Sequence, residues 1–108
     1  MRTNTNLAQA LTYVNALRQR AFGGASGNIT SGQLTTDFIL AERGRELLWE
    51  GHRRTDLVRF GKFTGATYLW AWKGNVVAGA STDAKYNLYP IPSNELSANP
   101  NLKQNTGY

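Results

Sequence analysis

Residues 36–60 constrain this chain more than any other stretch, because they predict a long amphipathic helix with glycines on its apolar face. Glycine in the interior of a helix costs about 1 kcal/mol relative to alanine, so packing must compensate. The glycines therefore predict that another backbone approaches this face closely. The face repeats at spacings of four, three and four residues, in the order Leu40, Gly44, Leu47 and Gly51.

A second amphipathic helix is predicted for residues 6–22, with Asn6 as its N-cap and Gly23 beyond its end. The glycine-rich residues 23–33 then predict a loop, and we expect a kink in the second helix near Gly51. Together the two helices are similar to one tetratricopeptide-like unit of a helical-repeat array. Such a unit cannot bury its apolar faces alone, so this chain is expected to be one piece of something larger.

The remaining residues, 63–108, lack a helical period and predict an irregular segment rich in loops. Residues 89–92 must be extended, because each of the two prolines disfavours the helical conformation of the residue before it. The predicted fold class is therefore mainly α. It consists of a tetratricopeptide-like helix pair, followed by an irregular segment with short extended stretches, and no domain boundary is predicted within residues 1–108.

Composition narrows the possible chemistry. The chain has no cysteine, which excludes disulfides, thiolate metal sites and cysteine nucleophiles. Its single histidine, His52, has no nucleophile and no orienting group placed beside it by the sequence. No apolar run reaches the roughly 18 residues that a membrane-spanning helix needs. We therefore predict no catalytic residue, no metal site and no cofactor.

The densest charge cluster lies on the predicted helix 36–60 and mixes both signs. Glu42, Glu46 and Glu50 are spaced by four, so they stack on one stripe, where like charges repel by a few tenths of a kcal/mol. Interleaved arginines offset this repulsion. A carboxylate stripe could also bind a metal or act as an acid–base pair, but no histidine stands at the matching helical step. We predict a structural ion-pair network of Glu42, Arg43, Arg45, Glu46, Glu50, Arg53, Asp56 and Arg59.

Three aromatic residues, Tyr68, Trp70 and Trp72, alternate along the irregular segment. If this segment is extended, the three side chains point to one side. With Lys73 and Asn75 nearby, such a row could stack on sugar rings or on nucleic-acid bases. We favour the alternative that the row covers the helical core, and we keep Tyr68, Trp70 and Trp72 as the candidate ligand-binding residues.

Three stretches, in this order, resemble the C-terminal part of the SusD/RagB family. Residues 13–21 are similar to its penultimate helix. Residues 34–62 resemble its C-terminal signature and include AERGRELLWEGHRRTDLVRFGK. Residues 88–96 (LYPIPSNEL) and 99–105 resemble its terminal segment. One departure is Thr106, where a proline commonly precedes the final Gly-Tyr pair; we expect little consequence.

This resemblance implies an α-helical, non-enzymatic lipoprotein on the surface of a Gram-negative outer membrane. Family members capture glycans or other nutrients above a SusC-like TonB-dependent transporter. They are several times longer than this chain, and their lipid anchor lies in a region absent here, so the remaining N-terminal part becomes an expected partner. No sugar-binding motif of the family can be transferred to this sequence. The motif residues resemble scaffold, namely Glu42, Arg43, Glu46, Glu50, Gly51, Arg53, Asp56 and Leu57.

Two alternative functions are kept. The first is a generic helical-repeat module that binds another protein and has no role in uptake. The second is a small basic nucleic-acid-binding module, suggested by the net charge of +5 and by the aromatic row. We do not favour nucleic acid as a partner, because the basic side chains are interleaved with acids on the same helix.

Overall fold

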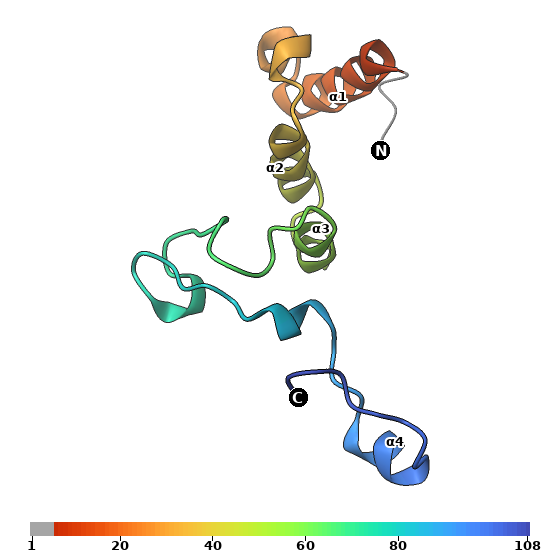
Figure 1. The fold of residues 1–108 in the computed structure, drawn as a ribbon. Helices are drawn as coiled ribbons and strands as arrows, with labels where there is room; N and C mark the ends of the chain where they lie inside the picture. The colour runs from red at the N-terminus through yellow and green to blue at the C-terminus, as the bar shows by residue number, and fades with distance from the viewer. Residues whose placement is uncertain (1–5) are drawn as a thin grey trace. The chain divides into compact units, whose positions relative to one another are not determined.

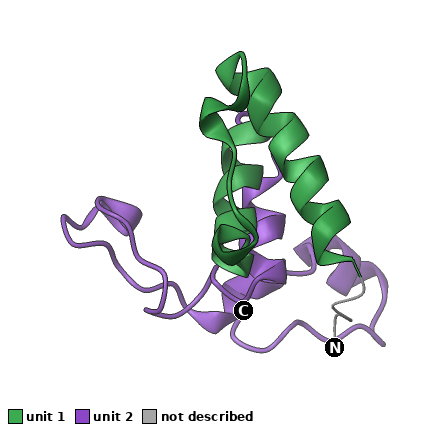
Figure 2. Ribbon diagram, turned by 90° about the horizontal axis from the view of Figure 1, so that it is seen from above, with its two compact units in different colours: residues 1–46 green, residues 47–108 purple. Residues whose placement is uncertain are grey.

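The computed structural model describes residues 6–108 and is mainly helical, which confirms the predicted fold class. Its described residues contain four α-helices joined by turns and loops (Figure 1). The chain divides into two compact units, residues 1–46 and residues 47–108 (Figure 2). The two are described separately below as unit 1 and unit 2.

Unit 1 begins with helix α1 (Leu7–Phe22). Asn6 occupies the predicted N-cap position, but its side chain donates to the Gln9 side chain at 2.7 Å rather than capping the helix backbone. The helix ends where Gly23 adopts a left-handed φ of 66° and returns its N–H to the Gln19 carbonyl. This is the usual use of glycine at a helix C-terminus, because glycine has no Cβ to clash in that conformation.

The glycine-rich connection after α1 contains two short 3₁₀ turns, Ala25–Gly27 and Ser31–Gln33. Asn15 of α1 holds this connection in place: its amide donates to the Ile29 carbonyl at 3.0 Å and accepts from the Ile29 N–H at 2.8 Å. The Phe22 ring lies directly on Gly27, where even a Cβ would collide with it. The predicted loop is therefore folded back on α1 by specific contacts.

The long helix predicted for residues 36–60 is wrong as one continuous element. The structure has α2 (Thr36–Glu46) in unit 1 and α3 (Arg53–Arg59) in unit 2, separated by six non-helical residues. Trp49 and Gly51 adopt left-handed φ values of 69° and 75°, and a right-handed helix cannot pass through such residues. The kink expected near Gly51 falls within this break.

Unit 2 continues from α3 into an irregular stretch with two 3₁₀ turns, Lys73–Asn75 and Ala84–Asn87, and ends with α4 (Ser93–Ala98) and a tail. An isolated antiparallel bridge between Gly65 and Thr82 closes the loop between them. Extended pairing in the described residues is limited to bridges of this kind, because no named strand occurs.

The C-terminal tail runs back along the segment that precedes α4 (Figure 1). Gln104 accepts from the Ile91 N–H at 2.8 Å and donates to the Ile91 carbonyl at 2.9 Å, much as a neighbouring strand would. The Tyr108 hydroxyl donates to the Leu88 carbonyl at 2.9 Å. These side chains satisfy backbone groups of a stretch that has no strand partner.

Few hydrophobic side chains are buried among the described residues: Val14, Ile29, Leu40 and Leu57. Many large ones are exposed, and Trp49 is 95% exposed. Large contiguous apolar surfaces are unusual on an independent soluble protein. Among the helices of residues 6–108, none is both long enough and apolar enough to cross a membrane.

Candidate functional site

In unit 1, Glu42 of α2 is the centre of a charge cluster. It accepts a hydrogen bond from Arg18 Nη1 at 2.9 Å and a second from Arg45 one turn along α2. Only 14% of the Arg18 side chain and 12% of the Glu42 side chain are exposed. Arg18 also donates to the Gly27 carbonyl, and its guanidinium lies against the Phe22 and Phe38 rings. The cluster thus joins α1, the glycine-rich connection and α2.

The predicted network is only partly seen. Glu42 pairs with Arg45 as expected, while Glu46 pairs with Arg20 of α1, which the sequence analysis did not include. Glu50 and Arg59 form no salt bridge with any other described residue. Asp56 is buried and Arg43 is half-buried. Arg53 donates to the Tyr68 hydroxyl at 2.9 Å.

In the described part of the chain, Glu42 and Glu46 both pair with arginines. An arginine side chain stays protonated at neutral pH, so these pairs cannot pass a proton between their members. His52 is exposed at the start of α3. Within residues 6–108, no three histidine, aspartate or glutamate side chains gather closely enough to hold a metal ion.

The aromatic row of unit 2 does not form a single flat face. Tyr68 and Trp70 meet edge to face, with ring centroids 5.8 Å apart at 61°. Trp72 has a left-handed φ of 68°, so the regular alternation of an extended segment is lost before it. Trp70 and Trp72 are 45% and 64% exposed, whereas Tyr68 is half-buried beneath Arg53. The structure therefore leaves two tryptophans, rather than three aromatic rings, accessible to a ligand.

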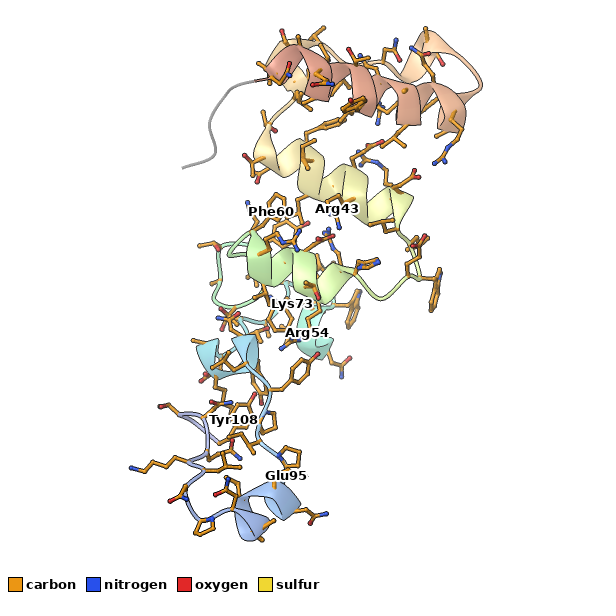
Figure 3. The ribbon with its side chains drawn as sticks, turned by 90° about the vertical axis from the view of Figure 1, so that its right-hand side faces the viewer. Arg43, Arg54, Phe60, Lys73, Glu95 and Tyr108 are labelled. Atoms are coloured by element: carbon orange, nitrogen blue, oxygen red, sulfur yellow. The ribbon has the colours of Figure 1, made fainter. Side chains whose placement is uncertain are left out.

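Lys73 organises the loop that carries these tryptophans (Figure 3). The residue is 7% exposed, and its Nζ lies 3.4 Å from the Phe63 carbonyl and 3.5 Å from the Tyr68 carbonyl. The same nitrogen lies 4.8 Å from the centroid of the Trp70 ring. Because a buried ammonium needs such partners, Lys73 ties this loop to the backbone on its N-terminal side.

Lys73→Met is expected to loosen the loop, because methionine fills similar space but cannot donate to the two carbonyls. The long donor–acceptor distances indicate a loss of about 1–2 kcal/mol. Faster hydrogen exchange of the Ala80 amide, which donates to the Lys73 carbonyl at 2.8 Å, measures the change. Lys103→Met, at an exposed position of the tail, is the control and should leave that amide unchanged.

Arg54 of α3 forms the other notable arrangement in unit 2 (Figure 3). Its guanidinium carbon lies 4.0 Å from the centroid of the Tyr89 ring and 4.9 Å from that of Phe63. Its Nη2 donates to the Tyr86 carbonyl at 2.5 Å. A shallow groove of about 450 Å³ opens beside it. Its lining, which we call the Arg54 groove, consists of Arg54, Phe63, Thr82, Tyr86, Leu88, Tyr89, Pro90 and Tyr108.

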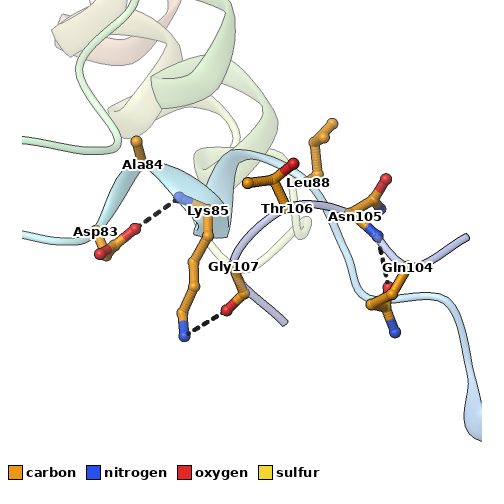
Figure 4. Close-up of a pocket in the computed structure, with 8 residues that line it drawn as sticks. All are labelled: Asp83, Ala84, Lys85, Leu88, Gln104, Asn105, Thr106 and Gly107. Carbon is orange, nitrogen blue, oxygen red and sulfur yellow. Dashed lines mark hydrogen bonds between the residues drawn. The ribbon is translucent and has the colours of Figure 1, made fainter.

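A second hollow of about 560 Å³ lies where the tail meets the Ala84–Asn87 turn (Figure 4). Lys85 Nζ donates to the Gly107 carbonyl at 3.1 Å, and the Lys85 N–H donates to Asp83 at 2.8 Å. The Lys85 ammonium also faces the Tyr86 and Tyr108 rings. The Lys85 ammonium thus holds the C-terminal tail in place. The sequence did not indicate these contacts of Arg54 and Lys85, because Tyr86 and Gly107 lie 32 and 22 residues away from them.

A model of the SusD family matches residues 1–108. The chain is 43% identical over 95 residues to the starch-binding protein SusD of Bacteroides thetaiotaomicron. That match covers 88% of this chain and 16% of the length of that protein.

Proposed function

This chain belongs to the SusD family, and from that membership we propose that it is the C-terminal helical scaffold of a non-enzymatic glycan- or nutrient-binding protein. The observation that carries the proposal is the 43% identity to a starch-binding protein over 88% of the chain. Because the match spans only 16% of that protein, binding is proposed as a property of the longer protein that contains this chain.

The arrangement in unit 1 supports a scaffold role. Arg18, Glu42 and Arg45 use their charges on one another, so they are not arranged to receive a ligand. Three of the arginines that contribute to the net charge of +5, namely Arg18, Arg20 and Arg45, also pair with carboxylates. Phosphate binding needs basic groups free to release counterions. This observation favours a scaffold over a nucleic-acid-binding module.

We extend the proposal to the setting in which such a protein works. The longer protein is a lipid-anchored component at the surface of the outer membrane, and its partner is a SusC-like TonB-dependent transporter. In cells, an antibody against this chain should detect its protein in the outer-membrane fraction. A SusC-like transporter should co-purify with it in detergent. Recovery from the cytoplasm without such a transporter would instead favour the generic helical-repeat module.

Binding is tested on the same longer protein by electrophoresis through gels that contain starch or another polysaccharide. Retardation without release of new reducing ends is the expected result. Release of new reducing ends would contradict the non-enzymatic proposal. Absence of retardation by every glycan tested would contradict glycan binding.

Trp70 and Trp72 test whether this chain itself contacts the ligand. We propose that the main glycan contacts lie outside residues 1–108. Trp70→Ala and Trp72→Ala should therefore change glycan affinity by less than about twofold, as expected of residues away from a binding centre. Tyr68→Phe, which keeps the ring and removes the hydroxyl that Arg53 donates to, is the matched control for the loop. A tenfold loss in either tryptophan variant, with Tyr68→Phe unchanged, would place a glycan subsite on this loop.

A further inference from the structure

The Arg54 groove brings four exposed aromatic and aliphatic side chains together. Leu88 and Tyr89 are 60% and 69% exposed, and Tyr86 and Tyr108 are 45% and 41% exposed. All four line the same shallow depression. A concave apolar patch of this kind typically marks a contact with another segment or another protein.

Arg54 places a positive charge beside that surface. A guanidinium carries five N–H donors, and the structure gives Arg54 one hydrogen-bond acceptor, the Tyr86 carbonyl. Its two flat contacts, with Tyr89 and Phe63, hold the group half-buried but supply no negative charge. No carboxylate among residues 6–108 forms a salt bridge with it. A half-buried guanidinium is best matched by a carboxylate that accepts two parallel hydrogen bonds.

We propose that the Arg54 groove receives a segment of the same polypeptide from outside residues 1–108. This segment places an aspartate or glutamate on Arg54 and an apolar side chain against Leu88. The inference rests on the proposed function, in which this chain is part of a longer protein, and on the 16% share of the starch-binding relative that it matches. At about 450 Å³ the groove has room for a few side chains of one segment.

Photo-crosslinking of the full-length protein tests where the groove is covered. p-Benzoylphenylalanine is placed at position 88. The control carries it at position 94, which is exposed on α4. Position 88 should crosslink within the molecule to one peptide outside residues 1–108 that contains Asp or Glu, and position 94 should not. Crosslinks from position 88 to a second copy, to a transporter, only within residues 1–108, or to nothing would overturn the proposal.

A charge exchange then tests the carboxylate. Arg54→Glu should shorten the half-life of the full-length protein under limited proteolysis by roughly tenfold, because it faces one acid with another. Changing the crosslinked acid to arginine in the same protein should restore most of that half-life. Arg59→Glu, on the same helix but without a salt bridge, is the control.

No rescue by the exchanged acid would reject the carboxylate contact. Failure of the proposed function is distinguishable, because it would appear as loss of glycan binding or of outer-membrane location in the unmodified protein, whatever position 88 crosslinks to.

Discussion

Arg18→Met is expected to destabilise residues 6–46 by about 2–3 kcal/mol, since removing one member of a largely buried ion pair leaves the other charge without full compensation. Glu42 would keep only Arg45, whose side chain is 56% exposed. The Gly27 carbonyl and the Phe22 and Phe38 rings would lose their cation at the same time. Hydrogen exchange of the Val14 and Leu40 amides, both at buried positions of unit 1, measures the loss.

Arg20→Met is the matched control. Arg20 lies two residues further along α1 and also pairs with a glutamate of α2, but 67% of its side chain is exposed. Exposed ion pairs contribute about 0–1 kcal/mol, so the two variants should differ clearly. A double variant, Arg18→Met with Glu42→Met, should be more stable than the sum of the two single changes predicts, because it leaves no buried charge behind. Equal losses for Arg18→Met and Arg20→Met would show that burial does not set the strength of these pairs.

The sequence predicted helix α1 closely, because the boundaries of this helix depend on local chemistry. The apolar spacing from Leu7 to Val14 repeats clearly, and Gly23 can take the left-handed conformation that ends a helix. The structure begins α1 at Leu7, one residue after the predicted start at Asn6. The mainly α class followed from this periodicity as well.

The break between α2 and α3 could be predicted only in part. Gly51 signalled a kink, but the left-handed Trp49 had no signal, because aromatic residues rarely take that conformation. The apolar spacing of residues 36–60 continues through the break, because Leu47 and Gly51 keep the same spacing as the apolar positions of α2. A period alone therefore could not show that residues 47–52 leave the helix.

The candidate site was harder to predict because its contacts join distant residues. Arg18 pairs with Glu42, which lies 24 residues away along the chain. Arg54 reaches the Tyr86 carbonyl across 32 residues. In the aromatic row, the alternation of Tyr68, Trp70 and Trp72 assumed an extended backbone, and the left-handed Trp72 breaks that assumption. Pairings of this range depend on how turns bring segments together, which spacing along the chain does not encode.

Gly79→Ala should be the most damaging single change in unit 2, at about 3 kcal/mol, because strain and a backbone clash add together. Gly79 has a φ of 81°, and a Cβ there would lie 2.5 Å from the Trp70 carbonyl oxygen, which cannot move without opening the loop. Gly65→Ala, in the same loop at a φ of 75° but facing open space, isolates the strain and should cost about 1 kcal/mol. Exchange of the Ala80 amide, bonded to the Lys73 carbonyl, measures both variants. Equal effects would mean that the close approach of Gly79 to the Trp70 carbonyl does not hold this loop.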